Sequence, residues 1–218
     1  MAVKLIASDL DGTLLTNKKE LSPRTREALD LAAAQGIHLV PATGRSFGSV
    51  PEMIREYPGV EYLITANGGA VYSVSEKKRI YQCLMTPESV EVAIAVRKRE
   101  KMVMEVVVDG VPYAEEAYVR DPIRYLATEY GARYIKATRT PVKDIIEFAA
   151  QHAKELDSIS FVCSHEDRNR LYTSLEKEIP DIYVTSSVSN LLEMGHKDAG
   201  KGLSLIHISE PTRLRRIS

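Results

Sequence analysis

The sequence predicts an α/β fold with a parallel sheet, and two observations carry this prediction. Short apolar runs alternate with helix signals over residues 3–69, the rhythm of parallel strands joined by covering helices. Three of these runs end in polar clusters, and the carboxyl ends of parallel strands form the edge at which open α/β sheets bind ligands. From about Tyr81 the pattern changes to an α+β block, which predicts a second domain inserted into the first.

Each element of the first part has a local signal. Ser22 offers a capping hydroxyl, Pro23 occupies the first helical position, and Gly36 is a typical helix stop. The apolar runs have the length and character of short buried strands. The expected elements are a strand over Val3–Ala7, a helix from Ser22 to Gly36, a strand over Ile37–Pro41, a short helix over Phe47–Arg55 and a strand over Tyr62–Ala66.

The second block begins with a helix signal at Thr86-Pro87 and contains Asp109-Gly110, a strong hairpin turn. We expect Leu191–Met194 to return to the main sheet. The other expected elements are a helix to about Lys101, strands over Val103–Val108 and Val111–Glu115, helices from Asp121-Pro122 and Thr140-Pro141, a strand over Ser158–Cys163, a helix over Glu166–Glu178 and a strand over Ile182–Ser186. The predicted domains are a core over residues 1–82, an insertion over 83–186, a return to the core over 187–202, and a tail over 203–218.

Composition narrows the class of protein. The chain of 218 residues is 44% hydrophobic, enough for a sizeable core, and its formal net charge of −1 offers no global field for nucleic acid or an anionic membrane. Cys83 and Cys163 lie far apart, which suits a reducing compartment, and the sequence shows neither a basic leader nor an apolar span of about 20 residues. We expect a soluble cytoplasmic protein that binds neither nucleic acid nor membrane. The oligomeric state is left open.

Asp9 and Asp11 flank Leu10 at the end of the first strand. In an extended chain residues i and i+2 project to one side, so both carboxylates would face one spot. Two such acids repel each other unless a cation lies between them, and their oxygen ligands favour Mg²⁺. The alternative is a pair of solvated turn or capping residues. A calcium-binding EF-hand loop does not fit, because Leu14 stands where that loop needs glycine.

This pair of carboxylates suits phosphoryl transfer through an aspartyl-phosphate. One carboxylate attacks phosphorus, the other handles the proton on the leaving oxygen, and magnesium offsets the repulsion between carboxylate and phosphate. Gly12 lets backbone N–H groups approach the phosphate closely. Thr43 and Gly44 at the neighbouring strand end would add a hydroxyl and further amides, although by themselves they are typical of a simple turn.

Lys201 belongs to a segment, Gly195–Gly202, that nearly matches the nucleotide-binding P-loop. The match fails because Gly202 stands where that loop needs a hydroxyl for magnesium. We therefore interpret Lys201 as a cation aimed at the phosphate and Asp9, the alternative being a solvated loop lysine. The histidines show no metal-ligand spacing, so we expect them to be structural or exposed.

Four ordered motifs resemble a known family. The segments Asp9–Leu14, Ala42–Arg45, Asn67-Gly68 and Lys201-Gly202 are similar to those of the haloacid dehalogenase superfamily, in particular its Cof-type phosphatases of subclass IIB. The resemblance covers about Lys4 to Gly202. It implies a Rossmann-like core with a parallel sheet and an inserted α+β cap of the C2 type, which closes over the site and selects the substrate.

The resemblance also implies roles for individual residues. Asp9 would be the nucleophile and a magnesium ligand, and Asp11 the general acid/base, which also touches the metal. Lys201 would neutralise the phosphate and the nucleophile. The implied phosphate-binding residues are Gly12, Thr43, Gly44 and Lys201, and the candidate substrate contacts are Arg45 and Asn67.

The sequence departs from this family at its end. Members continue to a fourth acidic motif, Gly-Asp-x-x-Asn-Asp, whose acids complete the magnesium shell. Here only Leu203–Ser218 follow, with Glu210 as their one acid, and residues 203–213 resemble the translation of a transposase sequencing adapter. We expect a foreign tail and a truncated chain in which magnesium binding and activity are impaired.

The sequence thus predicts a magnesium-dependent phosphatase of small phosphorylated metabolites such as sugar phosphates. Two alternatives remain open. One is a phosphosugar mutase of the same superfamily, which shares the aspartyl-phosphate step. The other is a non-catalytic protein that binds a phosphorylated metabolite with the same loops.

Overall fold

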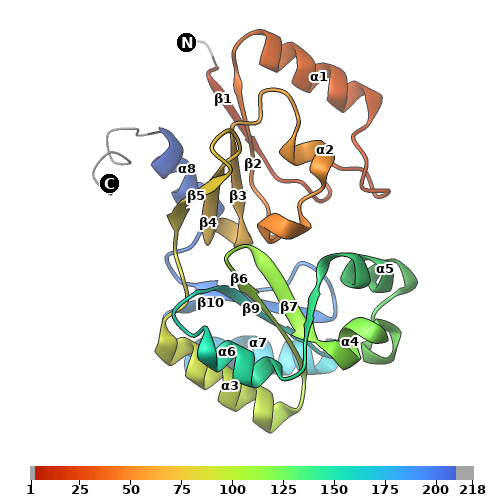
Figure 1. Cartoon of the computed structure of the whole chain (residues 1–218), viewed down its shortest axis with the longest axis vertical. Helices are drawn as coiled ribbons and strands as arrows, with labels where there is room; N and C mark the ends of the chain where they lie inside the picture. The colour runs from red at the N-terminus through yellow and green to blue at the C-terminus, as the bar shows by residue number, and fades with distance from the viewer. Residues whose placement is uncertain (1–2, 210–218) are drawn as a thin grey trace. The chain divides into compact units, whose positions relative to one another are not determined.

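The computed structural model describes residues 3–209, with side chains through Leu205, and these residues divide into two compact units (Figure 1). Residues 3–82 together with 199–209 form the first unit, and residues 83–198 form the second. The second unit is therefore an insertion in the chain of the first. It begins at Cys83 and ends at Asp198, well beyond Ser186, where we expected it to end.

Parallel strands form the centre of the first unit, as predicted. Its elements are β1 (Leu5–Ser8), α1 (Pro23–Ala34), β2 (His38–Pro41), η1 (Phe47–Ser49), α2 (Glu52–Arg55), β3 (Tyr62–Thr65), η2 (Ala66–Gly68), β4 (Ala70–Ser73), β5 (Lys78–Gln82) and α8 (Lys201–Ser209). β1 pairs in parallel with β2, and two isolated parallel bridges, Leu39 with Val60 and Ala42 with Ile64, link the β2 and β3 segments. β3, β4 and β5 form an antiparallel meander, of which only β3 was predicted.

Local signals explain the helices of the first unit. The Ser22 hydroxyl accepts a hydrogen bond from the Thr25 N–H at 3.1 Å, which caps α1 as predicted. The single helix expected over Phe47–Arg55 is wrong, because η1 and α2 are separate. Pro51 divides them, since proline lacks an N–H to donate and holds the preceding residue in extended backbone.

Two apolar layers enclose the strands of the first unit. Leu39 of β2 packs in a cluster with Ile54 of α2, whereas the next residue, Val40, belongs to a second cluster against which Leu205 of α8 packs. This alternation is the period of two that a strand imposes on its side chains. Figure 1 accordingly shows α1 and α2 on one side of these strands and α8 on the other.

The second unit is built on one six-stranded sheet in the order β10-β11-β9-β6-β7-β8. Its elements are α3 (Pro87–Glu100), β6 (Val103–Val108), β7 (Val111–Glu115), α4 (Glu116–Arg120), η3 (Pro122–Tyr125), α5 (Glu129–Thr138), β8 (Thr140–Val142), α6 (Ile145–Gln151), β9 (Leu156–Val162), α7 (His165–Glu178), β10 (Ile182–Thr185) and β11 (Leu191–His196). The predicted hairpin at Asp109-Gly110 is confirmed, because β6 and β7 pair with Val108 opposite Val111.

Three expectations for this block are wrong. Leu191–Met194 does not return to the main sheet: as part of β11 it pairs with β9 and β10, and Leu192 is fully buried opposite Phe161. Thr140-Pro141 starts no helix but lies in β8, an edge strand, where proline is tolerated. The following helix begins after Asp144, whose carboxylate caps it. Asp121-Pro122 opens only the short 3₁₀ helix η3.

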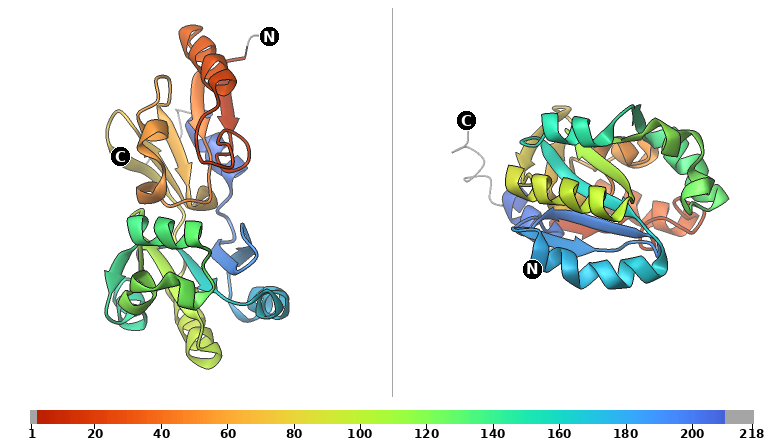
Figure 2. Two further views of the ribbon diagram at one scale, coloured as in Figure 1. Left: turned by 90° about the vertical axis from the view of Figure 1, so that its right-hand side faces the viewer. Right: turned by 90° about the horizontal axis from the view of Figure 1, so that it is seen from below.

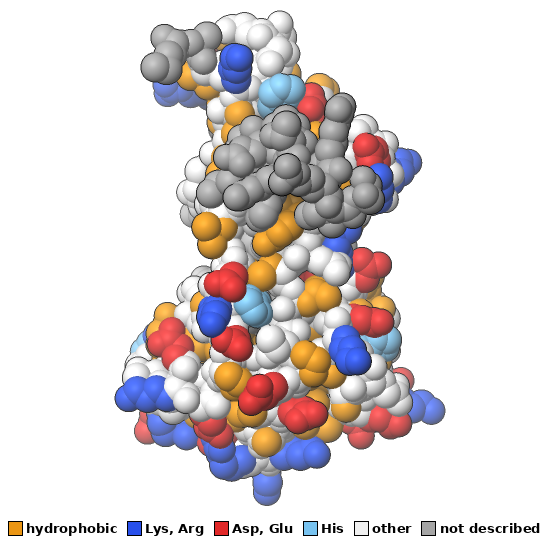
Figure 3. Space-filling view, turned by 90° about the vertical axis from the view of Figure 1, so that its left-hand side faces the viewer, with side chains coloured by type: hydrophobic (Ala, Val, Ile, Leu, Met, Phe, Trp, Pro, Cys, Tyr) orange, Lys and Arg blue, Asp and Glu red, His pale blue; other side chains and the backbone are white. Residues whose placement is uncertain are grey.

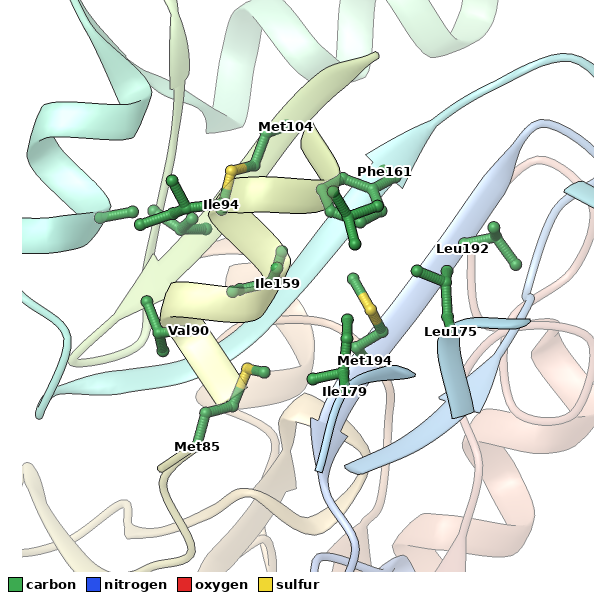
Figure 4. Close-up of a cluster of buried hydrophobic side chains, with 14 of the residues drawn as sticks. Met85, Val90, Ile94, Met104, Ile159, Phe161, Leu175, Ile179, Leu192 and Met194 are labelled. Carbon is green, nitrogen blue, oxygen red and sulfur yellow. The ribbon is translucent and has the colours of Figure 1, made fainter. Parts of the chain in front are cut away.

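One face of the six-stranded sheet carries the main core of the second unit. Figure 2 shows α3, α6 and α7 lying over that face. Figure 4 shows Met104, Ile159 and Phe161 of the sheet meeting Ile94 and Leu175 from two of these helices. Phe161 is fully buried, so this layer supplies most of the apolar burial that stabilises the unit.

The surface carries both charge signs. On the face shown in Figure 3, acidic and basic side chains are interspersed with apolar ones, in keeping with the formal net charge of −1. Among the described residues, no helix combines the length and the apolar character that crossing a bilayer requires.

Candidate active site

Asp9 and Asp11 lie in the turn that follows β1. β1 ends at Ser8, so our assumption that the extended backbone continues to Asp11 is wrong. The N–H of Leu14 instead donates to the carbonyl of Asp9 at 3.2 Å and closes a turn. Gly12 has a φ of +82°, a left-handed conformation that favours glycine. Leu10 is fully buried while the Asp9 and Asp11 side chains remain about one-third exposed. The turn therefore presents both carboxylates and anchors itself through the leucine between them.

Lys201 reaches Asp9 from the far end of the chain. Its Nζ lies 2.5 Å from Asp9 Oδ1, and the two side chains are 36% and 37% exposed. Lys201 is the first residue of α8, and the segment before it packs on Gly68, whose φ is +103° and where a Cβ would overlap the backbone of Gly200. The Ser204 hydroxyl also donates to the Gly68 carbonyl at 2.9 Å. The close approach at Gly68 thus positions the lysine, which is not a solvated loop residue.

Asp11 is held by two cations. Arg45 donates from Nε to Oδ2 at 2.8 Å and from Nη2 to Oδ1 at 2.9 Å, and Lys19 donates to Oδ1 at 2.6 Å. Chiefly because of the Arg45 hydrogen bonds, and with a further contribution from Lys19, the pKa of Asp11 is lowered to about 2, against the opposing effect of its burial. Arg45 is itself fixed by donating from Nη1 to the Ser49 carbonyl at 3.0 Å. Asp11 is therefore a carboxylate at neutral pH.

Lys19 is the residue of the candidate site that sequence reasoning missed. It lies in the loop between β1 and α1 with a φ of +62°, and its contact with Asp11 spans only eight residues. The neighbouring Lys18-Lys19 pair carries no motif, and nothing in the sequence distinguishes the second lysine from a solvated one.

Thr43, Gly44 and Asn67 form a second loop cluster at the ends of β2 and β3. Thr43 is 1% exposed, and its Oγ1 accepts from the Arg45 N–H at 3.2 Å. The N–H of Asn67 donates to the Thr43 carbonyl at 3.0 Å, and a Cβ on Gly44 would lie 2.9 Å from Asn67 Oδ1. The Asn67 amide thus lies close against Gly44, so the two loops pack together.

The structure thus brings the predicted site residues of the first unit together. The turn after β1, the loops after β2 and β3, and the start of α8 all contribute, so motifs separated by most of the chain meet at one sheet edge. Around Asp9 and Asp11 lie three cations, Lys19, Arg45 and Lys201. Three positive charges against two negative ones favour a bound anion.

The donor chemistry of Asp9 and Asp11 also fits a hard divalent cation. Mg²⁺ is usually held by one or two carboxylates together with water and substrate phosphate, and this turn offers two carboxylates. In residues 3–209 no group of three or more His, Cys, Asp or Glu side chains is arranged to hold a metal ion. A cation at this turn would therefore depend on Asp9, Asp11 and the phosphate of a ligand.

Comparison with known proteins decides the family. The family model described as haloacid dehalogenase-like hydrolase matches residues 6–216. The chain belongs to the haloacid dehalogenase-like hydrolase family. The resemblance stated from the motifs is confirmed, and by lineage the protein is a phosphoric monoester hydrolase of the Cof-type branch.

Individual relatives of this haloacid dehalogenase-like hydrolase are distant in sequence. HMP-PP phosphatase of Klebsiella pneumoniae is 26% identical over 208 residues, which cover 95% of this chain and 72% of that protein. Pyridoxal phosphate phosphatase YbhA of Escherichia coli is 28% identical over 174 residues, covering 78% and 62%. A crystal structure of a haloacid dehalogenase-like hydrolase from Bacteroides thetaiotaomicron is 26% identical with a TM-score of 0.75, covering 97% of this chain and 77% of the other.

The predicted tail is only partly described. Residues 203–209 lie in α8, with the Ser204 hydroxyl bonded to Gly68, and the family match extends to residue 216. Residues 210–218, including Glu210, lie outside the described residues. The foreign origin of the tail stays a prediction.

Proposed function

We propose that this protein is a phosphatase of small phosphorylated metabolites that works through an aspartyl-phosphate on Asp9. The observation that carries the proposal is the contact of Lys201 with Asp9, 2.5 Å long, beside the Asp11 carboxylate and its two cations. The ammonium of a lysine in this position offsets the repulsion between the Asp9 carboxylate and an approaching phosphate, which a nucleophilic carboxylate needs.

In this proposal Asp9 supplies the oxygen that forms the new bond to phosphorus while the bond from phosphorus to the leaving oxygen breaks. Water then hydrolyses the aspartyl-phosphate and releases inorganic phosphate. The left-handed turn at Gly12 and the buried Thr43 are the groups that we assign to the phosphate oxygens, together with Gly44 and Lys201.

We assign the proton transfers to Asp11. Held by Arg45 and Lys19, its carboxylate is too weakly basic to carry a proton near neutral pH. A phosphate dianion entering the site would compete for Arg45 and Lys19 and so release Asp11 for proton transfer. Arg45 is therefore a candidate substrate contact, and Asn67, packed on Gly44, is a second one.

Magnesium would be held by Asp9 and Asp11 and would supply charge neutralisation of the phosphate. Because each carboxylate already bonds a lysine or an arginine, the ion has to compete with these cations, and we expect weak binding in this chain.

The substrate class is inferred from relatives and from the insertion. Two relatives are named as phosphatases of HMP-PP and of pyridoxal phosphate, both small phosphorylated compounds. A structural neighbour that is 18% identical is named a sugar phosphatase, a likeness that shows the fold alone. We propose the second unit as the cap that selects among such substrates, sugar phosphates included.

Hydrolysis of p-nitrophenyl phosphate with and without magnesium tests the proposal. We expect release of inorganic phosphate that Asp9→Asn abolishes, whereas the matched control Asp121→Asn, an exposed aspartate of the second unit, leaves it unchanged. Turnover that survives in Asp9→Asn would overturn the assignment of the nucleophile. Transfer of the phosphoryl group to a sugar without release of phosphate would instead indicate a mutase.

A non-catalytic binding function is the second candidate, and the excess of cations around the two carboxylates favours it. It predicts that inorganic phosphate raises the melting temperature of both the wild type and Asp9→Asn, and that neither protein hydrolyses p-nitrophenyl phosphate.

A further inference from the structure

Cys83 and His196 lie near the two chain ends of the second unit and contact each other in space. Cys83 is the first residue of that unit, and His196, at the end of β11, lies close to its last residue, Asp198. The Cys83 Sγ lies 3.4 Å from His196 Nδ1, within the range of a sulfur hydrogen bond. Both residues are partly buried, with the imidazole 17% exposed, so the pair is sheltered but reachable from solvent.

The backbone defines the tautomer of this imidazole. The N–H of Asp198 donates to His196 Nδ1 at 3.2 Å, which makes Nδ1 an acceptor and leaves the ring proton on Nε2. The Cys83 thiol is therefore the donor in its contact with the same nitrogen. Proton transfer along this contact would produce a thiolate beside an imidazolium.

Charged side chains lie close to the ring. The Asp198 carboxylate lies 3.7 Å from His196 Nδ1, and the carboxylate of Asp181, the residue before β10, pairs with Lys197 at 2.6 Å. The Tyr183 phenol packs against Gly195, next to the histidine. Two carboxylates and one ammonium therefore lie near the ring.

The other cysteine provides an internal contrast. Cys163 is 4% exposed, and burial, the largest cause, raises the pKa of its thiol to about 11. It is therefore protonated and inaccessible under conditions in which a cysteine beside an imidazole is reactive.

We propose that Cys83 and His196 form a reactive thiol–imidazole pair that takes up small disulfides as a reversible mixed disulfide. His196 Nδ1 accepts the thiol proton, the Cys83 sulfur attacks one sulfur of the disulfide, and a new S–S bond forms as the old one breaks. The other half of the disulfide leaves as a thiolate with the bonding electron pair, so no further oxidant is needed. Because the chain enters the second unit at Cys83 and leaves it after Asp198, the adduct would adjoin both connecting segments.

The pH dependence of modification tests this proposal directly. The full chain is treated with dithiobis(nitrobenzoate) between pH 6 and 8, and the released nitrothiobenzoate is followed by its absorbance, with the modified cysteine identified by peptide mass. An ordinary thiol, with a pKa of about 8.5, loses about tenfold in rate for each pH unit below neutrality. The paired Cys83 should lose far less and level off toward pH 6.

A series of variants separates activation of the Cys83 thiol by His196 from simple solvent exposure of that thiol. At pH 6 we expect His196→Gln to slow modification about fivefold to tenfold, a figure that combines the larger thiolate fraction with the lower nucleophilicity of a less basic thiolate. The matched control His152→Gln, in which a histidine of the same unit bonded to Glu155 is replaced, should keep the wild-type rate. Cys83→Ser should abolish the fast reaction.

Two results would overturn the proposal. One is a wild-type rate that falls tenfold per pH unit down to pH 6, which needs no variant to be decisive. The other is a fast reaction that survives in Cys83→Ser and maps to Cys163.

Discussion

Replacing Gly68 by alanine should disturb the first unit more than any comparable glycine substitution. Gly68 has a φ of +103°, and a Cβ there would overlap the backbone of Gly200. The backbone conformation costs a non-glycine residue about 1–3 kcal/mol, and forcing the two segments apart costs about 1–3 kcal/mol more. Gly68→Ala should therefore lose about 2–6 kcal/mol and displace the segment that leads into Lys201.

Gly36→Ala is the matched control, because Gly36 also has a positive φ, +71°, but has nothing within 4 Å of an added Cβ. Gly36→Ala should lower the free energy of unfolding by only about 1–2 kcal/mol, because alanine is less stable than glycine in a left-handed backbone conformation. Hydrogen exchange measured on peptides from β2 and β3 reports the stability of the first unit without assuming that both units unfold together. Peptides from β6 and β9 should not change. A Gly68→Ala loss no larger than that of Gly36→Ala would refute the close approach as the constraint on this site.

Three further predictions concern buried charge, pH and packing. Arg139→Met should destabilise the second unit by about 3–5 kcal/mol in urea unfolding, because Glu105, 7% exposed and 2.7 Å from the arginine, is left buried without its partner. Adding Glu105→Gln to this variant should restore much of the lost stability. A loss below about 1 kcal/mol in Arg139→Met would contradict the role of the pair. The pKa of Asp11 is lowered to about 2 in the folded protein, so its stabilising contribution is complete above the ordinary value of 3.8 and is lost as the pH falls toward 2. Solvent screening limits this contribution to about 1 kcal/mol. In Arg45→Met, the pKa of Asp11 followed by NMR should return toward its ordinary value of 3.8. An unchanged pKa would exclude Arg45 as the cause of the shift. Phe161→Ala, at a fully buried position, should cost about 3–5 kcal/mol, whereas Ile123→Ala at a 58% exposed position should stay within about 0.5 kcal/mol in the same measurement.

Elements with a local cause were predicted well. Ser22 caps α1, and Asp109-Gly110 forms the turn between β6 and β7. Both signals are local, because a capping hydroxyl and a two-residue turn act over a few neighbouring residues. Elements that depend on partners were predicted badly. β11 has the same apolar character as a strand of the main sheet, and only its pairing with β9 and β10 places it in the second unit. Pro141 resembles a helix start until its neighbour β7 is known.

The candidate site divides in the same way. The residue types and the order of Asp9, Asp11, Thr43 and Lys201 point to phosphoryl transfer before any coordinates are known. Which cation touches which carboxylate could not be predicted, and Lys19 shows why: no motif marks it, and only the turn after β1 brings it to Asp11.

The sequence by itself determined the α/β class and the family, and it predicted phosphoryl-transfer chemistry at the strand ends, because these depend on residue type, spacing and chain order. Only the tertiary structure decided that the insertion runs to Asp198, that Lys19 and Arg45 hold Asp11, and that Cys83 meets His196. Each of these depends on contacts between residues far apart in the chain or across a turn. Such contacts are set by side-chain packing and strand pairing, which a local sequence pattern does not determine.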